Sequence, residues 1–98
     1  MNSDDLGKKI EYLCKVLGHL CHHCHDSRKC SGAPGLPDYI IVSATGKGIL
    51  WIELKEWGNL SPEQTIWKWA LKANGADFRL YRGHQWDEIE DALVELAS

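Results

Sequence analysis

Two short apolar runs separated by a turn constrain the fold of this 98-residue chain more than any other feature. Residues 39–42 read Tyr-Ile-Ile-Val and residues 49–52 read Ile-Leu-Trp-Ile, and both are rich in the β-branched and aromatic side chains that strands favour. The segment between them, Ser-Ala-Thr-Gly-Lys-Gly, is typical of a loop that reverses the chain. We therefore expect a β-hairpin whose second strand runs over 49–56.

The N-terminal third predicts a helix and a short strand before this hairpin. Apolar side chains recur at helical spacing over 4–17, and Gly18 follows as a helix stop. Residues 19–25 are compatible with a short strand. Residues 31–37 contain two glycines and two prolines and predict a loop.

The C-terminal third predicts a helix, a strand and a second helix. Ser61 can cap a helix, Pro62 suits its first position, and Gln64 can reach back as in a capping box. Residues 77–82 alternate as a strand does, and Asp87 opens a final helix. The predicted order α-β-β-β-α-β-α describes one α/β domain over residues 1–98, a mixed sheet with flanking helices.

Composition is that of a folded, non-membrane chain, with 44% hydrophobic and 26% charged residues. The apolar runs are too short to span a bilayer, and the N-terminus lacks the features of a signal peptide. We therefore expect a cytosolic protein whose four cysteines are thiols rather than disulfides. A net charge of −3 argues weakly against a nucleic-acid partner, but residues 87–98 carry five acids and no base. The remainder can still present a basic face that includes Arg28 and Lys29.

Two acids and a lysine are the candidate chemical groups. Side chains two apart on a strand share a face, so Glu53 and Lys55 project together while Ile52 and Leu54 point the other way. If the hairpin forms, Asp38 lies beside Glu53. Two carboxylates near a lysine suit Mg²⁺, which binds few carboxylates together with waters and phosphate oxygens. A solvated strand face with a turn aspartate is the alternative.

Three motifs in order carry a family resemblance: Gly35-Leu36-Pro37-Asp38, then Glu53-Leu54-Lys55, then Ser61-Pro62-Glu63-Gln64. Together they resemble the VRR-NUC branch of the PD-(D/E)XK nucleases, in its stand-alone phage and bacterial form. The segment from His23 to Arg28 and the Asn74-Gly75-Ala76 segment also resemble that family. The resemblance implies a restriction-endonuclease-like fold and a metal-dependent DNA endonuclease.

The resemblance also implies a role for each matched residue. Asp38 and Glu53 bind Mg²⁺ or Mn²⁺, with the Leu54 backbone carbonyl as a further ligand. Lys55 is catalytic. Gln64 lies close to the site, although a capping role explains the same residue.

The resemblance implies DNA as the partner. The family suggests branched DNA or Holliday-type junctions as the substrate, cut in the bacterial or phage-infected cytoplasm. We also expect a homodimer, because so small a domain buries little core and a second copy would suit a substrate with two similar strands. His23, Arg28 and Lys29 are the candidate DNA contacts, with Arg28 suited to phosphate.

One position departs from the family pattern. The first helix usually supplies a glutamate to the acidic cluster, and the corresponding position here falls near Ser3. Asp4, Asp5 or Glu11 are possible substitutes, and all three are equally explained as solvated helix charges.

Two other functions stay open. The chain could be a non-catalytic nucleic-acid-binding module, because the helix glutamate is missing. It could also be a zinc-stabilised interaction domain that uses Cys21, Cys24 and Cys30. Of the five tryptophans, Trp57 directly follows the Glu-Leu-Lys strand and is a candidate base-stacking or interface residue.

Overall fold

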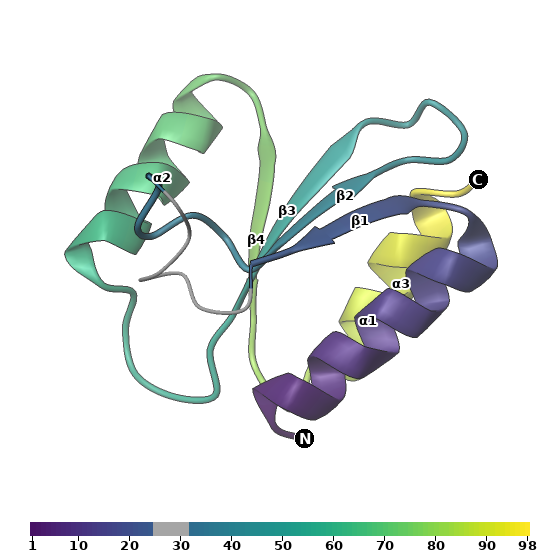
Figure 1. Ribbon diagram of the computed structural model, residues 1–98, viewed down its shortest axis with the longest axis horizontal. Helices are drawn as coiled ribbons and strands as arrows, with labels where there is room; N and C mark the ends of the chain where they lie inside the picture. Colours follow the sequence, from purple (N-terminus) through teal and green to yellow (C-terminus); the bar gives the residue numbers. More distant parts are fainter. Residues whose placement is uncertain (25–31) are drawn as a thin grey trace.

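The computed structural model describes residues 1–24 and 32–98 and contains three helices and four strands in the predicted order (Figure 1). The mixed α/β fold class and the order α-β-β-β-α-β-α are therefore confirmed. The elements are α1 (Ser3–Leu17), β1 (Leu20–His23), β2 (Tyr39–Val42), β3 (Ile49–Leu54), α2 (Pro62–Ala73), β4 (Asp77–Tyr81) and α3 (Trp86–Glu95).

The strands form one mixed sheet in the order β1-β2-β3-β4. β1 pairs with β2 and β2 with β3 in antiparallel fashion, and Tyr39 lies opposite Ile52 in the central hairpin. β3 and β4 are parallel, and α2 makes the crossover that a parallel pair requires. The predicted hairpin is confirmed.

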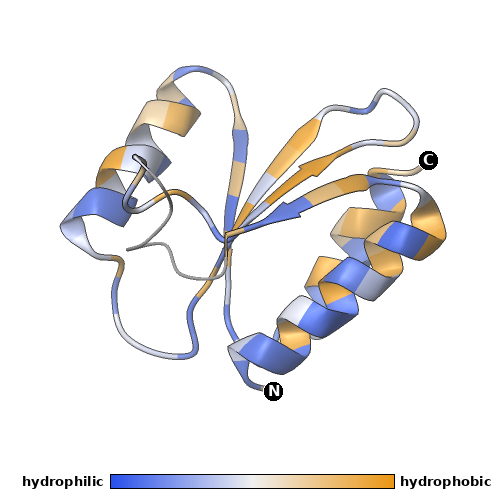
Figure 2. Cartoon of the chain, viewed as in Figure 1, coloured by the Kyte–Doolittle hydropathy of each residue, from blue (hydrophilic) through white to orange (hydrophobic). Residues whose placement is uncertain are grey.

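One face of the sheet carries the hydrophobic core. α1 and α3 lie together on this side and α2 lies on the other (Figure 1). The hydrophobic colouring of β2 and β3 reflects their central position (Figure 2). The core consists of apolar side chains that are less than a tenth exposed: Leu6, Ile10, Cys14, Tyr39, Ile41, Leu50, Ile52, Leu54, Tyr81, Ile89, Ala92 and Leu93.

The opposite face is covered less completely. Strand alternation turns Ile49, Trp51 and Glu53 toward the α2 side, away from buried Ile52. Leu20 and Ile49 lie in one cross-strand row with Val42 and are 72% and 45% exposed. This open sheet face therefore presents apolar side chains outside the core.

Several element boundaries differ from the sequence prediction. α1 begins one residue earlier, at Ser3, β1 covers only Leu20–His23 of the predicted 19–25, and β4 ends at Tyr81 rather than residue 82. β3 ends at Leu54 rather than residue 56. The Lys55 N–H still donates to the Tyr81 carbonyl of β4, and the chain bends from residue 56 onward. α3 begins at Trp86 after Gln85, so Asp87 lies in the first turn and does not open the helix. The Gln85 side chain accepts from the Arg82 N–H, which fixes the chain just before the helix. No helix in the described part of the chain is long and apolar enough to cross a bilayer.

Candidate functional site

Asp38 is fixed between three strands. It directly precedes β2, and its carbonyl accepts a hydrogen bond from the Cys24 N–H at 2.9 Å. Its side-chain Oδ2 accepts from the Leu54 N–H at 2.8 Å. Because Tyr39 lies opposite Ile52, the antiparallel register continues to bring Asp38 opposite Glu53. The predicted juxtaposition of these two acids is confirmed.

The carboxyl groups of half-buried Asp38 and buried Glu53 form a pair joined by a hydrogen bond. Only 3% of Glu53 is exposed. Burial, and after it the negative charge of Asp38, raises the pKa of Glu53 to about 9. Burial also raises the pKa of Asp38, although the Leu54 N–H favours its ionised form. Without a cation, the pair therefore retains a proton at neutral pH.

Two further predicted residues act on this pair. The positive charge of Lys55 lowers the pKa of both carboxyl groups, although burial outweighs this effect. Gln64 is buried, and its Nε2 donates to Glu53 Oε2 at 3.2 Å. The same side chain closes the capping box, because Gln64 Oε1 accepts from the Ser61 N–H at 2.8 Å. The capping box and the predicted closeness of Gln64 to the acidic pair are therefore both present.

The chemistry of these donors suits a hard divalent cation. Asp38 and Glu53 supply carboxylate oxygens, and a cation between them would relieve the repulsion that otherwise keeps one acid protonated. Leu54, whose carbonyl is the third predicted ligand, holds Asp38 through its N–H. Among residues 1–24 and 32–98, no three His, Cys, Asp or Glu side chains gather to hold a metal. Remaining ligands would have to come from backbone, water or substrate.

The first helix contributes no acid to the pair among its described contacts. Glu11 Oε1 lies 3.4 Å from His23 Nδ1, and Asp4 is an exposed residue of the first turn. Ser3, at the position of the expected family glutamate, donates its N–H to Glu56 Oε1 at 2.7 Å. A third acidic ligand from Asp4 or Glu11 stays a prediction.

His23 lies between the acidic pair and α1. Its ring stacks on Tyr39 with a centroid separation of 4.2 Å and an interplanar angle of 9°. The charge of His23 lowers the pKa of Asp38, so the two side chains are electrostatically coupled. Arg28 and Lys29, the other predicted DNA contacts, lie outside the described residues.

The cysteines differ from the sequence prediction. Cys24 is disulfide-bonded, so the expectation of four thiols is wrong at this position and its sulfur is no zinc thiolate. That expectation rested on cellular compartment, which does not determine which side chains meet. Cys14 and Cys21 are free and share a hydrogen bond. Cys30, the third predicted zinc ligand, lies outside the described residues.

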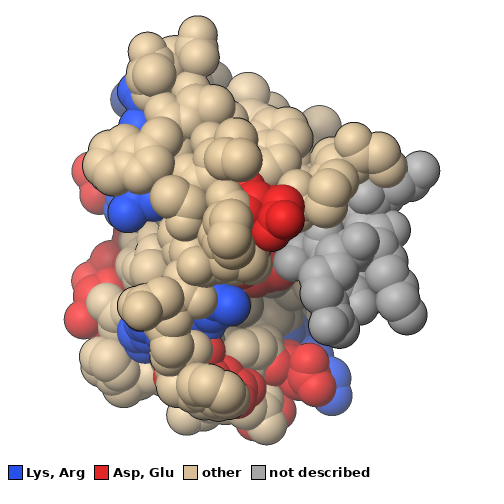
Figure 3. Space-filling model, turned by 90° about the vertical axis from the view of Figure 1, so that its left-hand side faces the viewer, with Lys and Arg blue, Asp and Glu red and all other residues tan. Residues whose placement is uncertain are grey.

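A cavity of about 370 Å³ opens beside Lys55. Its wall includes Trp57, which is 82% exposed, and Ser3 from the start of α1. Trp57 was predicted as a candidate contact, whereas the approach of Ser3 was not predicted, since the two residues are far apart in the chain. Figure 3 shows the side of the molecule that carries α2, where uncharged side chains cover wide areas between separate basic and acidic groups.

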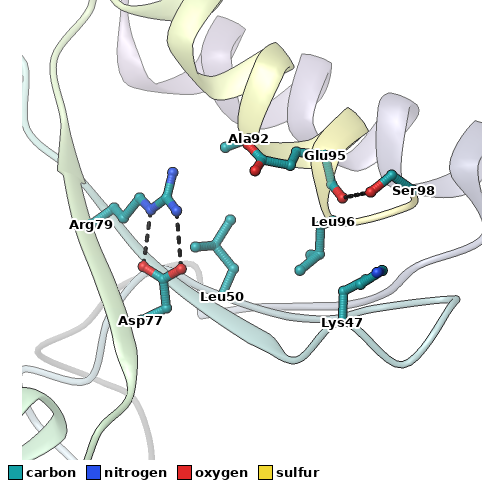
Figure 4. Close-up of a pocket in the computed structure, with 8 residues that line it drawn as sticks. All are labelled: Lys47, Leu50, Asp77, Arg79, Ala92, Glu95, Leu96 and Ser98. Atoms are coloured by element: carbon teal, nitrogen blue, oxygen red, sulfur yellow. Dashed lines mark hydrogen bonds and ion pairs between the residues drawn. The ribbon is translucent and has the colours of Figure 1, made fainter.

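A second cavity, of about 260 Å³, lies between β3, β4 and α3 (Figure 4). On one side Arg79 binds Asp77 at 2.9 Å, so the two charges largely neutralise each other. Buried Leu50 lines this cavity and lies on the core face of β3, opposite the face that carries Glu53. The second cavity is therefore separate from the acidic pair.

Comparisons with protein-family models, with curated proteins and with solved structures find no match.

Proposed function

We propose that this chain is a metal-dependent nuclease that hydrolyses DNA phosphodiester bonds with Mg²⁺ or Mn²⁺. The single observation that carries this proposal is the pairing of half-buried Asp38 with buried Glu53, on which the charge of Lys55 acts and which Gln64 holds. Placing two acids together out of water is unfavourable, and structural packing alone gives no reason for it. A divalent ion and a phosphate account for both the acids and the nearby amine.

Each residue has a distinct role in this proposal. Asp38 and Glu53 would hold the ion, with the Leu54 carbonyl as the further predicted ligand. When bound, such an ion polarises the phosphodiester and lowers the pKa of water. Lys55 would orient the attacking water or stabilise negative charge that develops on phosphorus. Gln64 orients Glu53 and simultaneously ties the start of α2 to the site.

We also propose that the active form is a homodimer acting on structured DNA, such as branched or Holliday-type junctions. The branched substrate is suggested by the family resemblance. The dimer is supported by the open sheet face, whose outer row of Leu20, Val42 and Ile49 contains no charged side chain. A second copy would present the same apolar surface, and homodimer interfaces resemble a domain core cut in half.

Replacement of Lys55 tests the nuclease proposal. The Lys55→Ala protein should retain the wild-type circular dichroism spectrum and lose cleavage by roughly 100-fold or more, since it lacks a charge that stabilises the transition state. Lys47→Ala is the matched control, because Lys47 lies in the β2–β3 turn, outside the site. It should cut at the wild-type rate.

Three results would count against this proposal. Wild-type cleavage by a folded Lys55→Ala protein would remove the assigned role of the amine. Cleavage that persists in excess chelator would remove the metal. DNA binding by both wild-type and Asp38→Asn protein, with no cleavage in Mg²⁺ or Mn²⁺, would favour the non-catalytic binding module.

A further inference from the structure

The cavity beside Lys55 shares Leu54 and Lys55 with the proposed reaction centre, whereas Asp38 and Glu53 do not line it. Leu54 holds Asp38, and Lys55 acts on both acids. The cavity volume of about 370 Å³ falls within the range of roughly 300–1,000 Å³ that is usual for ligand pockets. Its lining residues are Ser3, Leu54, Lys55, Glu56, Trp57, Gly58 and Asn59.

The segment that forms this cavity is fastened at the start of its bend, through the adjacent residues Lys55 and Glu56. The Lys55 N–H donates to the Tyr81 carbonyl at 3.1 Å, which ties the segment to β4. The Ser3 N–H donates to Glu56 Oε1 at 2.7 Å, which ties it to α1. These two hydrogen bonds fix the two residues that precede Trp57, so less backbone freedom remains to be lost when this segment binds a ligand.

Trp57 is a large apolar surface without a covering partner in the described chain. Its exposed fraction is 82%, and no aromatic or cationic side chain among residues 1–24 and 32–98 lies over its ring. Trp69 on α2 provides a contrast. The Lys68 and Lys72 amines lie 5.0 and 5.7 Å from its ring centroid, so its face is already occupied.

We infer that this cavity receives the nucleoside next to the cleaved phosphate, with the Trp57 indole stacked on its base. The inference rests on the proposed nuclease function. Every base has an aromatic face, so such stacking tolerates any sequence. The Glu56 carboxylate in the wall disfavours phosphate, whereas Ser3 and Asn59 offer hydrogen-bonding groups to the base and sugar.

An abasic-site experiment on the full-length protein tests this inference. Cleavage is measured in Mn²⁺, and binding is measured in Ca²⁺, on DNA with a single abasic site moved through the positions flanking the cut. On intact DNA, Trp57→Ala should raise KM and Kd about tenfold and leave kcat nearly unchanged. Trp57→Phe should restore most of the affinity because it keeps an aromatic face.

When the abasic site lies at the position that would enter the cavity, wild type and Trp57→Ala should have the same KM and the same Kd, because no base is left to stack. A penalty of the same size at every abasic position would overturn the inference, because it would mean that Trp57 acts through the fold. Unchanged KM and Kd in Trp57→Ala would overturn it as well. Trp69→Ala is the matched control and should bind intact DNA like wild type.

The two proposals fail in different ways. Wild-type protein that neither binds nor cuts DNA would refute the nuclease function and the stacking contact together. Wild-type cleavage with no effect of Trp57→Ala would refute the stacking contact alone.

Discussion

The stability of the metal-free protein should fall as pH rises from 7 to 9 because of Glu53. This side chain is 3% exposed, and burial and then the charge of Asp38 raise its pKa from 4.5 to about 9. An unfolded chain exposes the carboxyl to water, where it ionises near its ordinary value. The folded protein therefore holds a proton that the unfolded protein has already released.

The sign follows from this difference in bound protons. The pKa of Glu53 is 4.5 in the unfolded chain and about 9 in the folded protein, so its protonation stabilises the folded state. This stabilisation is fully present below pH 4.5 and is lost as the pH rises through 9. Between pH 7 and pH 9 the loss in unfolding free energy from one such proton is about 2 kcal/mol. For a domain of this size, that loss lowers the melting temperature by roughly 10 °C.

Glu53→Gln is the matched perturbation. Glutamine keeps the shape of the side chain and can still accept from Gln64 and donate to Asp38, but it has no proton to lose. Thermal unfolding followed by circular dichroism in chelator should show a large fall in melting temperature for wild type and a small one for the variant. Equal pH dependence in the two proteins would refute the assigned protonation of the pair.

Addition of Mn²⁺ should counteract the fall in wild-type stability between pH 7 and pH 9. An ion that binds only the folded state at 100 times its dissociation constant adds about 2.7 kcal/mol of stability. Wild-type protein should therefore be stabilised by Mn²⁺, more strongly at pH 9 than at pH 7, because fewer protons compete with the ion at the higher pH. Equal stabilisation of Glu53→Gln would show that the ion binds elsewhere.

Two further predictions concern α2 and the open sheet face. Gln64→Ala and Ser61→Ala should each lower the unfolding free energy measured in urea by about 1 kcal/mol, because each breaks the capping box. Only Gln64→Ala should also slow DNA cleavage, because only Gln64 contacts Glu53. Equal cleavage by these two variants would confine Gln64 to capping. If the open sheet face is the dimer contact, Leu20→Lys should halve the solution mass measured by light scattering. Val16→Lys is the control, because Val16 is 62% exposed on α1, and it should leave the mass unchanged. A monomeric wild type would remove the homodimer proposal.

Local patterns were sufficient to predict most of the fold. The β-branched and aromatic runs at 39–42 and 49–52, with the turn between them, predicted the hairpin, and the hairpin register then brought Asp38 opposite Glu53. Capping chemistry placed the start of α2 correctly, because Ser61, Pro62 and Gln64 act within one helical turn. These features depend on neighbouring residues, so a single sequence is enough to predict them.

Contacts between distant segments could not be predicted in the same way. The Ser3–Glu56 hydrogen bond depends on how α1 packs across the sheet, and no local pattern encodes that arrangement. The position of Lys55 likewise depends on its N–H meeting the Tyr81 carbonyl of β4. Both contacts border the cavity beside Lys55, so the sequence predicted the acids and the lysine but not the cavity next to them.

The packing of α2 links stability and function at one residue. All residues of α2 are described, and Gln64 is the only buried one among them. The apolar side chains of Ile66 and Trp69 are 68% and 59% exposed. A helix usually packs through an apolar stripe, but here the buried contact is polar and reaches Glu53. Any change in the ionisation of Glu53 therefore acts on the helix that covers the site. If a cation binds the acidic pair, the negative charge on Glu53 should strengthen the hydrogen bond from Gln64, so α2 should be held more firmly when the site is loaded.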